Sequence, residues 1–352
     1  MPTFQHSFLR EFVTDRLTEI AVDNTVASRV ANNLVESCLK GHDSHGVSML
    51  PRYIAAIAEG GLDPHADARI ILDAGALLSF NGGHGFGQVV GQQAMAAGIA
   101  RAKEFGVTVI GLADAHHLGR IGAWAEQAAQ AGLVSIHFAN VNSRSPVMPW
   151  QGQQPRLGTN PFCVGIPTSD GGHPLILDFA TSIIAGNKAR LAWSSGQDLA
   201  PGCIVDDQGQ PAVDPRWLMT APFGALLPFG QHKGSGLSIV CSLLGAALTG
   251  GLTERHDNRD KQRILNSMLS ILIDPEKLGG AANYQQEITG LLDWVRSSRD
   301  DNRLLLPGDA EQEKYHQRLH NGIDIDDTSW RQLTALQKPR EQSLQYTAVQ
   351  TQ

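Results

Sequence analysis

The chain has 352 residues, of which 42% are hydrophobic and 18% are charged. A chain of this length can bury one large core or two moderate ones, and we expect two globular domains. Lys and Arg number 28 against 35 Asp and Glu, and the net charge of -7 provides no broad positive surface for a phosphate polymer. We therefore expect no nucleic-acid partner.

The N-terminus and the cysteines indicate the cellular compartment in which we expect the protein. Residues 1–20 interrupt their apolar positions with charges, so they lack the continuous apolar region of a signal peptide. No stretch approaches the roughly 20 apolar residues that cross a bilayer, and we expect a cytoplasmic protein without membrane contact. The cysteines lie far apart without a Cys-x-x-Cys pair, and we expect them to be reduced: Cys38, Cys163, Cys203 and Cys241.

The N-terminal part of the chain predicts helices. In the first 60 residues, apolar side chains such as Phe8 and Phe12 recur near the helical period. From residue 68 short apolar runs replace this pattern, and 69–72 and 76–80 predict two strands of a hairpin or meander. An α+β domain is expected to begin here.

Helical and extended patterns then alternate along the chain. They predict helices over 89–105 and 121–131 and strands over 107–112, 133–139, 162–166 and 175–177. They further predict a Pro- and Gly-rich loop over 201–228, a buried helix over 234–248, an exposed charged loop over 254–263, a strand over 267–273 and a helical tail from about Asp309. Because the strands are short and irregularly spaced, we expect a mixed sheet in an α+β (mixed α/β) fold.

A first group of polar residues lies in Gly-His-Asp-Ser-His-Gly, residues 41–46. Histidine exchanges a proton near neutral pH, so His45 beside the hydroxyl of Ser44 can serve as a general acid. The alternative is structural, with Asp43 or Ser44 capping a helix and the histidines bonding only to the backbone.

A second group follows the predicted strand 107–112, in Asp-Ala-His-His-Leu-Gly-Arg-Ile-Gly, residues 114–122. A strand that feeds a helix N-terminus leaves backbone N–H groups for an anion such as a diphosphate or a carboxylate. His117 is therefore a candidate base or substrate contact. In the alternative interpretation, His116 and His117 are surface residues of an ordinary loop.

Two later segments also carry polar residues at element ends. Asp178 leaves an apolar strand before Thr181-Ser182, which predicts a cap able to hold a ribose hydroxyl or a nicotinamide edge. His232 and Lys233 precede a Gly-rich helix start, which predicts an anion site. The structural alternatives are a turn at Asn160 in the first segment and a tight helix contact in the second. The Gly-rich segment 82–91 lacks Gly-x-Gly-x-x-Gly, so a Rossmann site is not supported.

In chain order, GHDSHG, HHLGRIG, GTNPFCV, HKG and LLLPG resemble the malate/L-lactate dehydrogenase type 2 family, which includes sulfolactate, ureidoglycolate and diketogulonate reductases. The resemblance runs from about Glu19 to about Trp330, and its joint motifs are highly specific. It implies hydride transfer between NAD or NADP and a 2-oxo or 2-hydroxy acid, a non-Rossmann cofactor domain, no metal and a homodimer. The expected domains are a helical one (1–67 with 300–352) and a catalytic, NAD(P)-binding one (68–299).

The resemblance also assigns roles to individual residues. His45 and His117 are implied as the acid/base groups, with Ser44 beside them. Substrate contacts are implied at Met49, Arg52, Arg120 and Lys233. Cofactor contacts are implied at His45, Gly119, Arg120, Ile121, Ile176, Leu177, Asp178, Phe179, Ala180, His232, Asn266, Gly308, Asp309, Ala310 and Glu311.

One position departs from the family pattern. Many members carry an arginine four residues after the histidine of Ser-His-Gly, where it grips the substrate carboxylate, and here that position is Met49. A thioether suits a larger or aromatic 2-oxo acid, and Arg52 or Arg120 is expected to supply the missing cation.

Two other classes of protein stay open at this stage. His42, His45, His116 and His117 can be read as ligands of a metal-dependent hydrolase, and Met49 as a sign of a dinucleotide-binding protein without turnover. Between the two cofactors, Asp309 and Glu311 favour NAD, because carboxylates repel a 2′-phosphate, and NADP remains possible.

Overall fold

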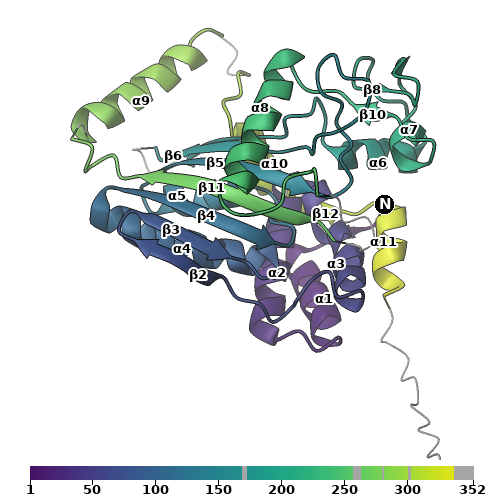
Figure 1. Cartoon of the computed structure of the whole chain (residues 1–352), viewed down its shortest axis with the longest axis horizontal. Coiled ribbons are helices and arrows are strands. Elements are labelled where there is room, and N and C mark those ends of the chain that lie inside the picture. Colours follow the sequence, from purple (N-terminus) through teal and green to yellow (C-terminus); the bar gives the residue numbers. More distant parts are fainter. Residues whose placement is uncertain (169–172, 257–262, 280, 300–302, 337–352) are drawn as a thin grey trace, which may run out of the picture.

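The computed structural model describes residues 1–168, 173–256, 263–279, 281–299 and 303–336. A central sheet lies between the helices of the N-terminal segment and a smaller part built from the middle of the chain (Figure 1). The sheet positions the candidate site, because the loops that follow its strands face both of these parts.

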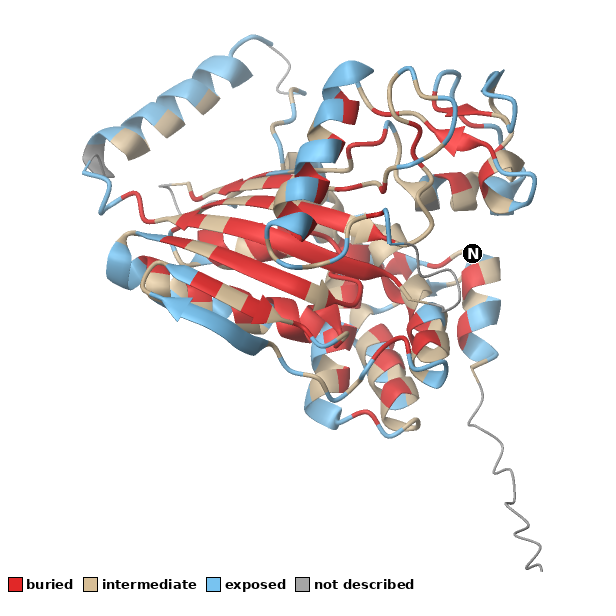
Figure 2. Ribbon diagram, in the orientation of Figure 1, coloured by how far each residue is buried: buried red, intermediate tan, exposed pale blue. Residues whose placement is uncertain are grey.

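The central sheet is mixed, as the sequence predicts. Its seven strands lie in the order β2 (Arg69–Ala74), β3 (Leu77–Asn81), β4 (Val107–Ala115), β11 (Leu265–Ile273), β5 (Val134–Asn142), β6 (Phe162–Ile166) and β7 (Leu175–Phe179). The β3–β4 pair is parallel and the other neighbours are antiparallel. The middle strands are buried and β2 is an exposed edge (Figure 2).

Helices cover both faces of the sheet. One face packs against α4 (Gly87–Phe105) and α5 (Gly122–Gln130), and the other against α8 (His232–Ser242). The α4 helix ends at Gly106, whose φ of +86° is a left-handed conformation that glycine adopts without strain. Within the described ranges, no helix has both the length and the apolar character of a membrane span.

The two ends of the chain pack together beside the sheet. The N-terminal helices are α1 (His6–Thr18), α2 (Asn24–Leu39) and α3 (Leu50–Ala58), and the C-terminal ones are α10 (Asp309–Asn321) and α11 (Asp327–Thr334). The carboxylate of Asp23 caps α2 by accepting from two backbone N–H groups. β1 (Thr3–Phe4) pairs with β12 (Ile323–Asp324), so the two ends share one core.

The predicted loop 201–228 is wrong in part, because it contains regular structure. It holds β8 (Ile204–Val205), β9 (Pro211–Ala212), α7 (Arg216–Met219) and β10 (Ala225–Leu226), preceded by α6 (Gly186–Ser195). These elements enclose a small core of their own that includes Leu199, Ile204 and Leu218. A strand of two residues is too short to show an alternating apolar pattern, so the sequence did not predict these strands. The helix α9 (Ala281–Arg296), also absent from the prediction, stands away from the body (Figure 1).

Two predictions of burial are also wrong. The helix predicted over 234–248 buries its small polar residues, while Ile239 and Leu243 are 45% and 54% exposed. Its last turn, Leu243–Ala247, is a π-helix. Glu254, which was expected in an exposed loop, is 9% exposed, and its carboxylate accepts from the hydroxyl of Ser242; residues 257–262 of that loop lie outside the described residues. Pattern alone did not reveal this buried polar contact.

Candidate active site

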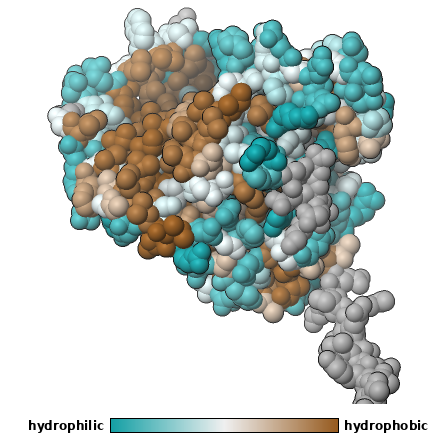
Figure 3. Space-filling view, in the orientation of Figure 1, coloured by the Kyte–Doolittle hydropathy of each residue, from teal (hydrophilic) through white to brown (hydrophobic). Residues whose placement is uncertain are grey.

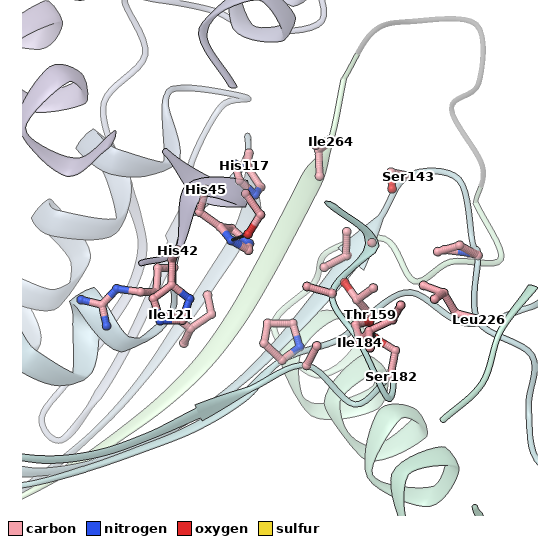
Figure 4. A pocket seen from close by; sticks show the side chains of 18 of the residues that line it. His42, His45, His117, Ile121, Ser143, Thr159, Ser182, Ile184, Leu226 and Ile264 are labelled. Atoms are coloured by element: carbon pink, nitrogen blue, oxygen red, sulfur yellow. Dashed lines mark hydrogen bonds between the residues drawn. The ribbon is translucent and has the colours of Figure 1, made fainter. Parts of the chain in front are cut away.

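A cavity of about 940 Å³ lies where the N-terminal helices, the sheet and the small central part meet. It brings together most of the predicted site residues: Ser44, His45, Met49, Arg52, His117, Gly119, Arg120, Ile121, Leu177, Asp178, Phe179, Ala180 and Asn266. Figure 4 shows His45 and His117 on one wall, across the cavity from Thr159, Ser182 and Ile184. Residues that are distant in sequence therefore face one space.

The two histidines come from different parts of the chain. His45 ends the 3₁₀ turn Asp43–His45 that follows α2, and the turn is held by an ion pair of 2.6 Å between Arg318 and Asp43. His117 follows β4. Gly87 permits its position, because a Cβ at Gly87 would collide with the carbonyl of His117. The imidazole rings stack with their centroids 5.4 Å apart and an interplanar angle of 16°.

Both imidazoles are neutral in the folded protein. Burial, followed by the electrostatic effects of the neighbouring His42 and Arg120, lowers the pKa of His45 to about 4. Burial and the neighbouring histidines lower the pKa of His117 well below its usual value. The Nδ1 of His45 lies 2.8 Å from the hydroxyl of Ser44, and the Nδ1 of His117 lies 2.7 Å from the hydroxyl of Tyr53.

Arg120 occupies the wall between this cavity and a smaller hollow of about 190 Å³. Arg120 is 3% exposed, and its guanidinium forms an ion pair of 2.6 Å with Glu126, to which Lys40 also binds at 2.6 Å. Burial is the largest single influence and lowers the pKa of Arg120, but the charge and hydrogen bond of Glu126, together with the charge of Asp178, outweigh it, so the pKa is raised. Its Nε and Nη1 have no hydrogen-bond partner among the described residues, so they remain available to an anion.

Asp178 lies beside Arg120 and lines both spaces. Its carboxylate accepts from the backbone N–H of Gly122, the first residue of α5, at 2.7 Å. Burial raises its pKa, and the nearby Arg120 acts in the opposite direction. The predicted cap at Thr181-Ser182 is wrong: both hydroxyls donate to backbone carbonyls, and α6 begins after Ala185 without a side-chain cap.

The predicted cofactor residues at the start of α10 do not line the large cavity. Gly308 and Glu311 line the smaller hollow together with Ile176, and Glu311 lies 3.2 Å from His42. Asp309 faces other surface hollows and accepts from His173 at 2.9 Å, and Ala310 is exposed. Arg120 and Asp178 line both spaces, so the smaller hollow adjoins the large cavity.

Two predicted residues lie apart from this region. His232 and Lys233 form the first turn of α8 rather than preceding it, and both are exposed. The ring of His232 contacts Trp150 edge to face with 6.1 Å between centroids. Neither residue lines the large cavity or the smaller hollow in the single chain.

Arg52 and Arg120 were expected to supply the cation that Met49 lacks, and the structure distinguishes them. Met49 and Arg52 both line the cavity, and no ion pair of Arg52 with a carboxylate is found in the described part of the chain. Arg120 is already held by Glu126. Of the two arginines expected to bind the substrate carboxylate, Arg120 is paired with Glu126, whereas Arg52 has no carboxylate partner among the described residues.

Sequence reasoning missed several residues of this site. Tyr53 and Gln88 lie behind His117, and Lys40 and Glu126 hold Arg120. A tyrosine among apolar residues on a predicted helix is a signal of a buried polar contact, because its hydroxyl needs a polar partner when it is buried. The signal is weak, since the sequence does not identify that partner. The wall formed by the small central part, with Ile183 and Leu218, carried no signal because its elements are so short.

The histidine-rich segments do not assemble into a metal centre. His116 is fully buried, with Nε2 3.5 Å from the backbone nitrogen of Ile264, and His42 contacts Glu311. In the chain as described, no group of three or more His, Cys, Asp or Glu side chains is arranged to hold a metal ion. The four cysteines are free and buried.

Known proteins resemble this chain over almost its whole length. The sequence profile described as malate/L-lactate dehydrogenase matches residues 4–334. Hydroxycarboxylate dehydrogenase B of Escherichia coli O157:H7 is 40% identical over 331 residues, which cover 93% of this chain and 91% of the relative. An E. coli structure assigned to the malate/lactate dehydrogenase type superimposes with a TM-score of 0.91 at 38% identity, covering 96% and 94% of the two chains. The sulfolactate dehydrogenase structure from Methanocaldococcus jannaschii has a TM-score of 0.84 at 30% identity, covering 95% and 96%.

Proposed function

Since the chain belongs to the malate/L-lactate dehydrogenase family, we propose that it interconverts a 2-oxo acid and a 2-hydroxy acid by hydride transfer, with His45 and His117 as the acid/base groups. The observation that carries this proposal is the stacked pair of neutral imidazoles in a cavity that also contains Leu177 to Ala180. Two polar ring nitrogens beside an apolar wall suit a carbonyl oxygen and a flat ring.

The large cavity and the smaller hollow fit a nicotinamide dinucleotide, the cofactor type used in this family. The fit rests on Arg120, whose Nε and Nη1 are buried without a partner in the described chain at the junction of the two spaces. A forked guanidinium in this position suits a diphosphate. The nicotinamide end would lie near Ile121 and Asp178, and the adenosine end near Gly308 and Glu311. The acidic Glu311 favours NAD over NADP, because it repels a 2′-phosphate.

The bound cofactor would supply or accept the hydride, and the residues of the chain do the remaining work. Arg52 would bind the substrate carboxylate, which fixes the reacting carbon in the cavity. The substrate oxygen would then lie beside the stacked imidazoles, which exchange its proton and stabilise its developing charge. A bound carboxylate also raises the pKa of a neighbouring histidine toward neutrality, because an opposite charge favours the protonated ring.

The cavity also indicates the class of substrate. Its volume is about 940 Å³, and the small central part contributes Leu218, Met219 and Leu226 to its wall, together with the cationic Arg190. Met49 leaves the position of the usual arginine neutral. We infer a substrate with a large aliphatic or aromatic side chain.

An absorbance assay at the nicotinamide band tests the proposed function. The purified protein is given NADH or NADPH with a series of 2-oxo acids that runs from small to aromatic side chains. We expect turnover with at least one bulky 2-oxo acid, and stronger NADH than NADPH binding in a fluorescence titration. Binding of NADH without turnover of any 2-oxo or 2-hydroxy acid would identify a binding protein and contradict the proposal.

We also propose a homodimer. The face of the molecule seen in Figure 3 carries an apolar area. Exposed apolar side chains on β2, on α8 and on the π-helical turn after it include Ile70, Leu72, Ile239 and Leu243. Contiguous exposed apolar residues of this kind mark association surfaces. Light scattering should give twice the monomer mass, and Leu243→Lys should shift the protein toward the monomer; a monomeric wild type would contradict this proposal.

The predicted domains and compartment remain proposals as well. The division into 1–67 with 300–352 and 68–299 is supported by the shared core of the two ends of the chain. Limited proteolysis should first cleave between these units, and the small central part around Ile204 should be released next. A cytoplasmic location is tested by fractionating the source cells.

A further inference from the structure

A buried tyrosine connects the interior of the protein to His117. Tyr53 lies on α3 with a relative exposure of 0%, and its hydroxyl oxygen lies 2.7 Å from Nδ1 of His117. Tyr53 is not one of the residues that line the cavity, whereas His117 is. The phenol therefore cannot touch a ligand in the cavity, and it acts on such a ligand only through the imidazole.

The side chain of Gln88 favours one direction of this hydrogen bond. Its Nε2 lies 2.9 Å from the hydroxyl oxygen of Tyr53 and donates to it. A phenol has one hydrogen, and because it accepts from Gln88, that hydrogen is free to be donated to Nδ1 of His117. Nδ1 is then an acceptor and carries no hydrogen. In a neutral ring, the hydrogen must be on Nε2, the nitrogen left for the cavity.

Tyr53 is suited to orient the ring rather than to supply a proton. Burial raises the pKa of Tyr53, so the hydroxyl keeps its proton at neutral pH. Burial and nearby positive charge keep His117 neutral. The contacts therefore hold a single tautomer of His117 with little tendency to change its charge.

We propose, on the basis of the proposed function above, that Tyr53 and Gln88 are positioning residues that hold His117 as a neutral Nε2–H donor toward the substrate oxygen. In the direction of reduction, the carbonyl carbon gains a hydride from the reduced dinucleotide. The bound substrate carboxylate raises the pKa of His45, so that this ring takes up a proton before the transfer. The oxygen takes that proton, His45 becomes neutral again, and His117 keeps its hydrogen while it donates a hydrogen bond to the oxygen. The products are a 2-hydroxy acid and the oxidised dinucleotide. The two imidazoles therefore have different roles, because His45 transfers the proton and His117 donates a hydrogen bond.

The geometry around His45 is consistent with this division. The Nδ1 of His45 contacts the hydroxyl of Ser44, which can donate or accept a hydrogen bond. Ser44 is only partly buried and lines the cavity. His45 can therefore change its protonation state without leaving a buried group unpaired, whereas His117 cannot.

The first test reads the tautomer of His117 without any turnover. The full-length protein is labelled with ¹⁵N-histidine, and the signals of His117 are assigned by their loss in His117→Gln. We expect the nitrogen shifts of a neutral ring with its hydrogen on Nε2. A hydrogen on Nδ1 in the wild type would overturn the proposal, whatever the substrate of the protein is.

The second test measures catalysis in Tyr53→Phe, which keeps the ring and removes only the hydroxyl. We expect kcat to fall about 10- to 100-fold, with KM nearly unchanged, because His117 loses its fixed tautomer but the carboxylate contact remains. The ¹⁵N spectrum of the variant should show a mixture of tautomers. Gln88→Leu should have a smaller effect in the same direction.

Tyr284→Phe is the matched control, because it removes a phenol hydroxyl on α9, outside the cavity. Its kcat and the His117 signals should equal those of the wild type. A kcat for Tyr53→Phe within about twofold of the wild type would overturn the positioning role. If the wild type turns over no 2-oxo or 2-hydroxy acid, the proposed function fails, and the tautomer test still decides whether Tyr53 and Gln88 set the state of His117.

Discussion

The imidazoles of His45 and His117 stack with 5.4 Å between their centroids, although one follows a helix of the N-terminal segment and the other follows a strand of the central sheet. Their stacking reflects the relation between these two parts of the molecule. The cavity and its chemistry depend on that relation, because both rings line it.

Removing either imidazole should abolish most activity. We expect His45→Ala and His117→Ala each to lower kcat by about 100- to 10,000-fold, because each ring contacts the reacting oxygen in the proposed mechanism. NADH binding should remain detectable in a fluorescence titration, since the diphosphate contact at Arg120 is unaffected. Full turnover in both variants would refute the proposed roles of the two imidazoles at the substrate oxygen.

Met49→Arg should change the preferred substrate. An arginine here adds a cation to the cavity that can grip a carboxylate, and it also fills part of the space for a large side chain. We expect kcat/KM to rise about tenfold for small 2-oxo acids and to fall by a similar factor for bulky ones, or roughly 1.4 kcal/mol each way. Met49→Leu is the control and should keep the wild-type order of substrates; an unchanged order in Met49→Arg would show that this position does not select the substrate.

Arg120→Lys should weaken dinucleotide binding. Lysine keeps the positive charge but lacks the fork that reaches a diphosphate with two N–H groups. We expect Kd for NADH to rise about tenfold, with Glu126 still paired to Lys40. Arg101→Lys, which alters the surface ion pair with Asp73, should leave Kd unchanged. An equal Kd in Arg120→Lys and the wild type would place the diphosphate elsewhere.

Acid should destabilise the protein in part through His137. This residue is fully buried between the hydroxyls of Ser135 and Ser270, and burial lowers its pKa to about 3. The usual pKa of 6.5 applies in the unfolded chain. The folded state therefore favours the neutral ring, and this contribution is complete above pH 6.5 and is lost as the pH falls toward about 3.

The measurement is urea unfolding at pH 7 and pH 5. For His137 alone we expect the free energy of unfolding to fall by about 2 kcal/mol between these values. His137→Asn should be less stable at pH 7 but should lose less on going to pH 5, because it has no ring to protonate. The exposed His65→Asn should keep the wild-type pH dependence. The same pH dependence in His137→Asn would show that His137 does not contribute to acid sensitivity.

The sequence by itself determined the local features of this protein. The spacing of apolar residues predicted most helices and the strands of the sheet. A helix or a strand with one buried face carries apolar residues at a regular spacing along its length. The polar motifs at 41–46, 114–122 and 176–180 were also recognisable, because their residue types are chemically distinctive, and their joint order indicated the family.

Only the tertiary structure decided which of these residues meet. The insertion of β11 between β4 and β5 joins strands from distant parts of the chain, and no local pattern encodes such a pairing. The bond from Tyr53 to His117 and the pairing of Arg120 with Glu126 depend on burial and on the approach of separate elements. The physical reason is that periodicity reports which face of an element is buried, whereas the partner of a buried polar group is fixed by long-range packing.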